Sequence, residues 1–234
     1  MDYLFSDFEI VKEHFRGKRV AVVGSGPTGT QNEPGFIDGH DLVVRVNNYK
    51  TKGEKSGVAY DYTETLGKRT DVFYSFFGSS IGKTKEELIA DGVKLCMSKL
   101  PNSKPFHSEW AAARGKEESH DYRPHYRRRE GFWFCPTYCP DDAHFLELFE
   151  YLGMHQATTG FSAIWDLVKC EPKELYITGF DFFVSGVHNV DEGWRKKNSD
   201  DPHGHDPKAE KDAVLYFSGK HDFVRLDKYL GGLK

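Results

Sequence analysis

Cysteines, long apolar runs and excess charge are all scarce in this sequence, and each shortage excludes a class of protein. The four cysteines, in a chain of 234 residues without a secretory signal, are too few for a disulfide scaffold and predict reduced, buried thiols. No apolar run approaches the roughly 18 residues of a membrane span. The net charge of −4 gives no sign of a nucleic-acid or membrane surface. We therefore expect a cytoplasmic protein, or a soluble domain of a larger one.

The remaining composition is that of a soluble globular domain. Hydrophobic residues make up 38% and charged residues 29% of the chain, whose 234 residues suffice for one α/β domain with a full core. Apolar patterns predict strands at 19–24, 41–47, 70–76, 93–97, 131–135 and 174–179. Helices are predicted from a capping box at Ser6 and Glu9 to about Phe15, at 83–91, 141–152 and 159–169, and from about Pro207. This alternation predicts a single domain over residues 1–234, with a mostly parallel, Rossmann-like sheet flanked by helices.

Two segments do not follow this alternation. Residues 98–130 are rich in Arg, Lys, His and Pro, include the run Arg127–Arg129, and form a loop long enough to be functional or disordered. A basic run is most often a solvated face, and the alternative here is a lid or an acceptor-binding region. Residues 184–205 are also polar and irregular. They contain three histidines, which are candidates for acid–base chemistry: His188, His203 and His205.

A glycine-rich loop follows the first of these strands. The sequence GSGPTG at residues 24–29 fits the dinucleotide-binding pattern G-x-G-x-x-G. That pattern requires a helix directly after the third glycine, because the helix N-terminus holds the pyrophosphate. Residues 30–39 lack a helical period and contain Pro34, and the next strand ends in Asn47 instead of an acidic residue. A ligand other than a dinucleotide is therefore expected, while a flavin- or NAD-binding oxidoreductase stays open as an alternative.

A second candidate site lies at the start of a predicted helix. Residues 158–160, Thr-Thr-Gly, precede an amphipathic pattern. Helix-terminal amides and hydroxyls can bind an anion, although an ordinary helix cap explains the same residues. The next strand ends in Gly-Phe-Asp at residues 179–181. Ligands of parallel sheets bind beyond the carboxyl ends of the strands, so both segments are expected at the edge that carries the glycine loop and Asn47.

Three short motifs thus follow one another along the chain. The first comprises VVG at residues 22–24 and IDGHDLVVRVN at residues 37–47, and the second comprises TTG at 158–160 and TGF at 178–180. The third is the pattern H-x-x-x-x-E at residues 205–210. In this order they resemble the large, small and short motifs of the sialyltransferase family, glycosyltransferase family twenty-nine.

The resemblance extends from about Arg19 to Glu210, with no match in the middle third. His188, which lies 17 residues before His205, falls where the family has a further histidine. Each motif alone is weak, and the ordered set is fairly specific. The resemblance implies a GT-A-variant-like fold and a short member of microbial or viral type, because the Golgi anchor of eukaryotic relatives is absent.

The chain departs from the family pattern at several positions. Arg19 and Val20 stand where animal members have the first cysteine of a disulfide, so that Cys170, near the second position, has no partner. Ser25 stands where an asparagine is expected in the glycine loop. The family's aromatic cluster after the first histidine is replaced by Asn-Val-Asp at residues 189–191.

The resemblance implies transfer of a sugar acid, sialic acid or a relative such as Kdo, from a CMP-activated donor to a glycan hydroxyl with inversion. His205 is the implied general base and His188 the proton donor to the leaving phosphate, since an imidazole pKa of about 6.5 suits acid–base work at neutral pH. Glu210 would start the next helix and orient the loop or His205. The implied donor-binding residues are Gly24, Ser25, Gly26, Asn47, Thr158, Thr159, Gly160, Gly179 and Phe180.

Neither a metal nor a cofactor besides the CMP-activated donor is expected. Many nucleotide-sugar transferases hold Mg²⁺ or Mn²⁺ with Asp-x-Asp, and no two aspartates of this chain lie two residues apart. The expected partners are a CMP-sugar and a glycan acceptor, without nucleic acid. Two further classes stay open: a catalytically idle glycan-binding module of the same fold, and a metal-dependent hydrolase that uses His188, His203 and His205.

Overall fold

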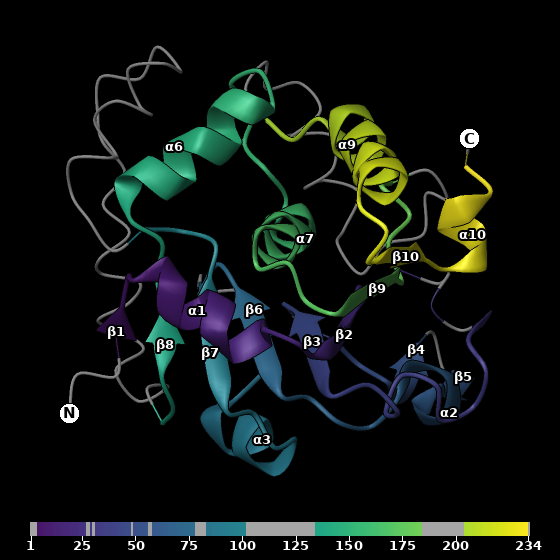
Figure 1. Cartoon of the computed structure of the whole chain (residues 1–234). Coiled ribbons are helices and arrows are strands. Elements are labelled where there is room, and N and C mark those ends of the chain that lie inside the picture. Colours follow the sequence, from purple (N-terminus) through teal and green to yellow (C-terminus); the bar gives the residue numbers. More distant parts are fainter. Residues whose placement is uncertain are drawn as a thin grey trace.

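The core of the molecule is one parallel sheet. A computed structural model describes residues 4–26, 29, 31–47, 49–55, 58–77, 83–101, 134–183 and 204–233. Over these residues, an 8-stranded sheet has the order β1-β8-β7-β6-β3-β2-β9-β10, and every neighbouring pair is parallel (Figure 1). Its strands are β1 (Leu4–Phe5), β2 (Arg19–Val23), β3 (Leu42–Val46), β6 (Val72–Ser75), β7 (Leu95–Ser98), β8 (Thr137–Tyr138), β9 (Glu174–Thr178) and β10 (Val224–Leu226).

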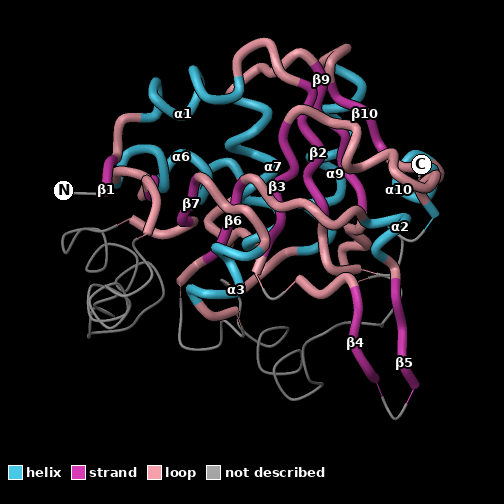
Figure 2. The backbone as a smooth tube through the Cα atoms, turned by 90° about the horizontal axis from the view of Figure 1, so that it is seen from below, coloured by secondary structure: helices cyan, strands magenta, loops and turns pink. Residues whose placement is uncertain are grey.

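Helices cover both faces of this sheet. In Figure 1, α6, α7 and α9 lie above the sheet and α3 lies below it. A separate antiparallel hairpin of β4 (Lys52–Lys55) and β5 (Val58–Asp61) extends away from the body of the domain (Figure 2). The helices are α1 (Phe8–Phe15), α2 (Thr63–Leu66), α3 (Lys85–Ala90), α6 (Asp142–Tyr151), α7 (Thr159–Lys169), α9 (Pro207–Lys220) and α10 (Lys228–Gly231).

The strand sequences explain why the sheet is covered on both sides. Successive side chains of a strand point to opposite faces, and β2 is apolar at both. Val20 and Val22 belong to the core cluster that includes α1, α7 and α9, whereas Ala21 and Val23 pack in a second cluster on the other face. The helix α7 is buried from Phe161 to Val168, so it lies at the centre of the first cluster.

The order of the strands creates a switch point between β2 and β9. From β2 the chain proceeds through β3, β6, β7 and β8 toward one edge, and it then returns to place β9 and β10 on the other side of β2. In open α/β sheets, ligands bind outside the carboxyl ends of the strands at such a point. The glycine loop directly follows β2, so it lies at this position.

The predicted fold class is confirmed, and several element boundaries are wrong. The N-cap of α1 is Asp7, which accepts a hydrogen bond from the backbone of Glu9, so the predicted capping box at Ser6 does not form. Of the strand predicted at 131–135, residues 131–133 lie outside the described residues and residues 134 and 135 form a bend, while β8 begins at Thr137. The hairpin, α2, β10 and α10 were not predicted. No helix in the described ranges is long and apolar enough to cross a bilayer.

Candidate functional site

The glycine loop is in direct backbone contact with the end of β9. The amide of Gly24 donates to the carbonyl of Thr178 at 2.8 Å, and that of Gly26 donates to Gly179 at 2.7 Å. A Cβ atom on Gly24 would lie 2.3 Å from the carbonyl oxygen of Gly179. A Cβ on Gly179, whose φ is +76°, would lie 2.7 Å from the carbonyl oxygen of Gly24. These glycines are therefore required because two backbones touch, whatever the loop also binds.

No dinucleotide-type helix follows the loop in the described residues between β2 and β3. Residues 29 and 31 have 3₁₀ geometry, and residues 34–39 form turns. The side chain of Asn32 holds this segment, since it donates to the carbonyl of Gly29 at 2.7 Å and accepts from the Tyr176 hydroxyl at 2.6 Å. The described part of the segment between β2 and β3 therefore lacks the helix N-terminus on which dinucleotide binding at such a loop depends.

Phe180 connects the end of β9 to the start of α7. A Cβ on Gly160 would lie 2.7 Å from Cε1 of the Phe180 ring, so the ring packs directly on the first turn of the helix. The structure thereby brings five predicted site residues into one contiguous group, which we call the glycine cluster: Gly24, Gly26, Gly160, Gly179 and Phe180.

The turn beyond Phe180 is strained, and Asp227 holds the end of β9 that precedes it. Phe182 and Phe183 have φ values of 48° and 61°, a region that side chains other than glycine rarely adopt. Asp227, the N-cap of α10, accepts from the Thr178 hydroxyl at 2.8 Å and from the amide of Gly179 at 3.2 Å. The role of this aspartate could not be predicted from the sequence, because it lies 48 residues after Gly179. Residues with a strained backbone conformation are found more often at functional sites than elsewhere.

Glu210 holds the helix start at Thr158. It lies in the first turn of α9, as predicted, and its carboxylate accepts from the Thr158 amide at 2.6 Å and from the Thr158 hydroxyl at 2.7 Å. The same hydroxyl accepts from the amide of Phe161 at 3.1 Å and caps α7. Glu210 thus fixes the orientation of the amides that would face an anion, while Thr159 is the first residue of the helix.

His205 faces the same segment from the other side. Its Nδ1 lies 2.5 Å from the carbonyl oxygen of Gln156, and Nδ1 of His155 lies 3.2 Å from the carbonyl oxygen of Gly204. Because a carbonyl only accepts, Nδ1 of each ring carries the proton, and the lone pair of a neutral His205 is on Nε2. The two reciprocal bonds hold residues 155–156 against 204–205. His155 has no motif signal, and His188 and His203 lie outside the described residues.

Lys99, at the carboxyl end of β7, is a further residue that sequence reasoning missed. Its buried ammonium group donates to the carbonyl of Ala157 at 2.8 Å, one residue before the Thr158 amide that Glu210 binds. Burial lowers the pKa of Lys99 to about 8, which the nearby Glu210 partly opposes. Burial also raises the pKa of Glu210 to about 7, against the effect of its Thr158 bonds and of Lys99. Lys99 and Glu210, two buried ionisable groups, therefore bind the backbone of the same turn, which precedes α7.

Asn47 and Ser25 lie at the same edge of the sheet, beyond the glycine cluster. Asn47 follows β3, the neighbour of β2, and adopts a left-handed φ of 50°. Its amide donates to the carbonyl of Tyr74 at 2.9 Å, and its side-chain oxygen lies 3.5 Å from the Ser75 hydroxyl. Ser25 is exposed at the tip of the glycine loop.

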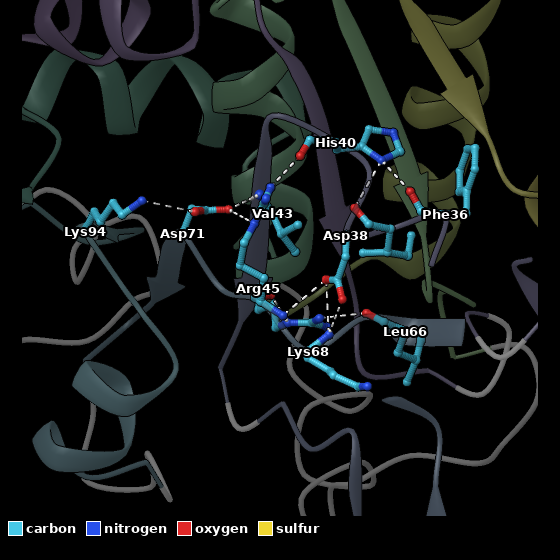
Figure 3. Close-up of polar contacts among 11 residues, drawn as sticks. Phe36, Asp38, His40, Val43, Arg45, Leu66, Lys68, Asp71 and Lys94 are labelled. Carbon is cyan, nitrogen blue, oxygen red and sulfur yellow. Dashed lines mark hydrogen bonds and ion pairs between the residues drawn. The ribbon is translucent and has the colours of Figure 1, made fainter. Parts of the chain in front are cut away.

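The charged residues of the first motif make hydrogen bonds to backbone groups of neighbouring segments (Figure 3). The buried guanidinium of Arg45 donates to the carbonyls of Arg69 at 3.1 Å and Leu66 at 2.6 Å. The carboxylate of Asp38 accepts from the amides of Lys68 at 2.9 Å and Arg69 at 3.2 Å. Burial lowers the pKa of Arg45, and nearby acids oppose that shift. These residues fix the segment between α2 and β6, whereas Asn47, the last residue of the motif, lies at the sheet edge.

His40 and Asp41 of the same motif also bind the backbone. Nδ1 of His40 lies 3.1 Å from the carbonyl oxygen of Phe36, and Asp41 accepts from the amide of Arg19 at 2.7 Å. The histidine is buried and distant in sequence from the loops that carry His205. Across the described part of the chain, no three His, Cys, Asp or Glu side chains are grouped as a metal site would require.

Solved structures resemble this chain in fold. The monofunctional α-2,3-sialyltransferase Cst-I from Campylobacter jejuni is 15% identical, with a TM-score of 0.53 over 90% of this chain and 76% of its own. A mammalian sialyltransferase is 19% identical, with a TM-score of 0.51 over 90% of this chain and 69% of its own. No protein-family profile matches the chain, and no curated protein matches its sequence. At these identities the likeness shows a sialyltransferase-type α/β fold.

The buried pair predicts a specific pH dependence of stability. The pKa of Glu210 is about 7 in the folded chain against an ordinary 4.5, so its contribution is lost as pH rises through about 7. The pKa of Lys99 is about 8 against 10.5, so its contribution returns as pH rises above about 8. These two groups therefore make stability lowest between about pH 7 and pH 8.

Replacing Lys99 with methionine will change that profile. In the wild type the unfolding free energy rises above pH 8, by about 3 kcal/mol at pH 10.5, and this rise will be absent from the variant. The decrease in unfolding free energy that follows ionisation of Glu210 will move to higher pH, because the neighbouring cation is gone. Urea unfolding from pH 5.5 to 10.5 measures both effects. Lys208→Met, which removes an exposed ammonium paired with Asp212, is the control and should leave the profile unchanged. Parallel profiles for wild type and Lys99→Met would contradict the assignment.

Proposed function

We propose that the chain is a CMP-sugar-dependent, inverting glycosyltransferase of sialyltransferase type, which transfers sialic acid or a related sugar acid such as Kdo to a glycan hydroxyl. The observation that carries this proposal is the convergence of its three motifs. The glycine cluster joins the first motif to the second, and the bonds of Glu210 to Thr158 join the second to the third. Two sialyltransferases of similar fold support the same class.

The proposed donor site extends along the carboxyl edge of the sheet. The nucleoside would lie near Asn47 and the glycine loop, and the phosphate would face the amides at Thr159 and Gly160. Those amides lie at the positive end of α7, where a negative charge that grows during bond cleavage is stabilised. Glu210 and Lys99 would act on this site by positioning the turn that precedes the helix.

The proposed reaction is an in-line displacement at the anomeric carbon. His205 would take the proton of the acceptor hydroxyl through Nε2, because its Nδ1 proton is directed at the carbonyl of Gln156. The hydroxyl oxygen bonds to the anomeric carbon while the bond to the CMP phosphate breaks, with inversion. His188 would protonate the leaving phosphate. No metal is assigned to this mechanism.

An assay of CMP release tests the proposal. Purified protein is incubated with CMP-sialic acid or CMP-Kdo and a panel of glycan acceptors, with and without EDTA, and CMP affinity is measured by calorimetry. We expect acceptor-dependent CMP release with one of the donors, at the same rate in EDTA. No turnover of either donor together with no CMP binding would refute the function. Glycan binding without CMP affinity would identify an idle binding module instead.

A further inference from the structure

Two cysteine thiols outside the candidate site are in contact. Sγ of Cys135 lies 3.6 Å from Sγ of Cys96, and both residues are buried, at 6% and 1% exposure. Cys96 is on β7, in register with Thr137 of β8, and Cys135 lies two residues before Thr137 on the segment that enters that strand. A disulfide needs about 2.05 Å between sulfurs, so the pair must approach by roughly 1.5 Å.

We propose that Cys96 and Cys135 are a modification site, at which a peroxide converts the two thiols into one disulfide. The inference rests on the contact of the sulfurs and is independent of the proposed function. Two thiols buried in an apolar cluster do not need to touch for packing alone, and here the contact spans 39 positions of sequence. A peroxide suits the site because it is small enough to reach nearly buried sulfur.

The environment assigns different roles to the two thiols. The hydrogen bond with Cys96 lowers the pKa of Cys135, whereas the bond with Cys135 and burial raise the pKa of Cys96. Cys135 is the more exposed of the two thiols, so the oxidant reaches it first, and its thiolate is the nucleophile. Cys96 is then the resolving thiol, already at contact distance.

The chemistry balances in two steps. Sulfur of Cys135 attacks one peroxide oxygen, the O–O bond breaks, and the departing hydroxide takes the Cys135 proton as water, which leaves a sulfenic acid. Sulfur of Cys96 then attacks the Cys135 sulfur, the S–O bond breaks, and the second hydroxide leaves as water with the Cys96 proton. Two thiols and one peroxide thus give one disulfide and two waters.

The disulfide would close the chain between β7 and the entry to β8. The closed segment contains Lys99, which holds the carbonyl of Ala157 at the start of α7. A cross-link over a loop of this size removes entropy from the unfolded chain. We expect oxidation to raise Tm by roughly 5–10 °C.

Peroxide titration of the native protein tests the inference. Intact mass under denaturing conditions should show loss of two hydrogen atoms, reversed by dithiothreitol, and proteolytic mapping should link Cys96 to Cys135. Cys135→Ala should abolish the cross-link and the rise in Tm. Cys170→Ala, which removes a thiol from the separate cluster around α7, is the matched control and should retain both.

Several results would overturn the inference, and the wild-type protein alone can provide them. They are a bridge between Cys135 and Cys139, sulfinic acid without a cross-link, and four unchanged thiols at peroxide concentrations that oxidise free cysteine. The variants are accepted only if their far-UV circular dichroism matches that of wild type.

Discussion

Replacing His205 with asparagine is expected to lower kcat/KM for sugar transfer by about 10²–10⁴-fold, the usual contribution of a general base. The asparagine side-chain NH₂ lies near the position of Nδ1, so it can still donate to the carbonyl of Gln156. Nε2, the proposed proton acceptor, is removed. The loss should fall on kcat, and CMP affinity measured by calorimetry should stay within about two-fold, because the base acts on the acceptor.

His155 provides the matched control for this prediction. Its Nδ1 makes the reciprocal bond to the carbonyl of Gly204, so His155→Asn perturbs the same two segments without touching the proposed base. We expect it to change kcat/KM by no more than a few-fold. Activity of His205→Asn within a few-fold of wild type would show that His205 is not the base. An equal loss in both variants would show that the histidines only hold the loops together.

Most of the sheet could be predicted because its strands are short, continuous apolar runs. β2 and β3 are buried on both faces, so each of their side chains must be apolar or have its polar groups bonded within the protein, and the sequence shows this as an apolar run bounded by turn residues. The start of α7 was predictable for a local reason, since Thr158 caps the helix with its own hydroxyl. The two-residue β8 is too short to give a pattern, and β4, with the sequence Lys-Gly-Glu-Lys, has no apolar side chain from which a hairpin could be recognised.

The candidate site was predictable only where its residues belong to an ordered motif. The sequence placed Gly24, Gly160 and Gly179 at the edge of the sheet, but it could not show that they touch one another. Lys99 and Asp227 were missed because their effects act on backbone groups that lie 58 and 48 positions away. Their local sequence is that of an ordinary lysine and an ordinary helix cap.

Motif membership also misleads about role. Arg45 belongs to the first motif and lies one residue before the end of β3, a strand that leads to the site, which suggests contact with a ligand. Its guanidinium is instead buried among carbonyls of residues 66 and 69, so its loss would affect folding before it affected binding. A pattern identifies which residues matter, and the contacts decide whether they matter for chemistry or for structure.

Replacing Gly24 with alanine is expected to destabilise the free protein by about 3 kcal/mol or more. The new Cβ would lie 2.3 Å from the carbonyl oxygen and 2.8 Å from the carbonyl carbon of Gly179, both backbone atoms. Rotation of a side chain cannot relieve this clash, and separating the backbones would break the bonds from Gly24 to Thr178 and from Gly26 to Gly179. Urea unfolding of the ligand-free variant measures the effect.

Gly219→Ala is the control, because this glycine lies within α9 and a Cβ there meets nothing within 4 Å. That variant should be more stable than wild type by about 0.5–1 kcal/mol, the helix preference of alanine over glycine. The comparison also separates two explanations of the glycine loop. If Gly24 is required only for close approach of a ligand, Gly24→Ala will unfold like wild type and lose CMP affinity alone. If the glycine loop is first a backbone contact between β2 and β9, stability will fall with no ligand present, and any loss of CMP affinity will follow from that.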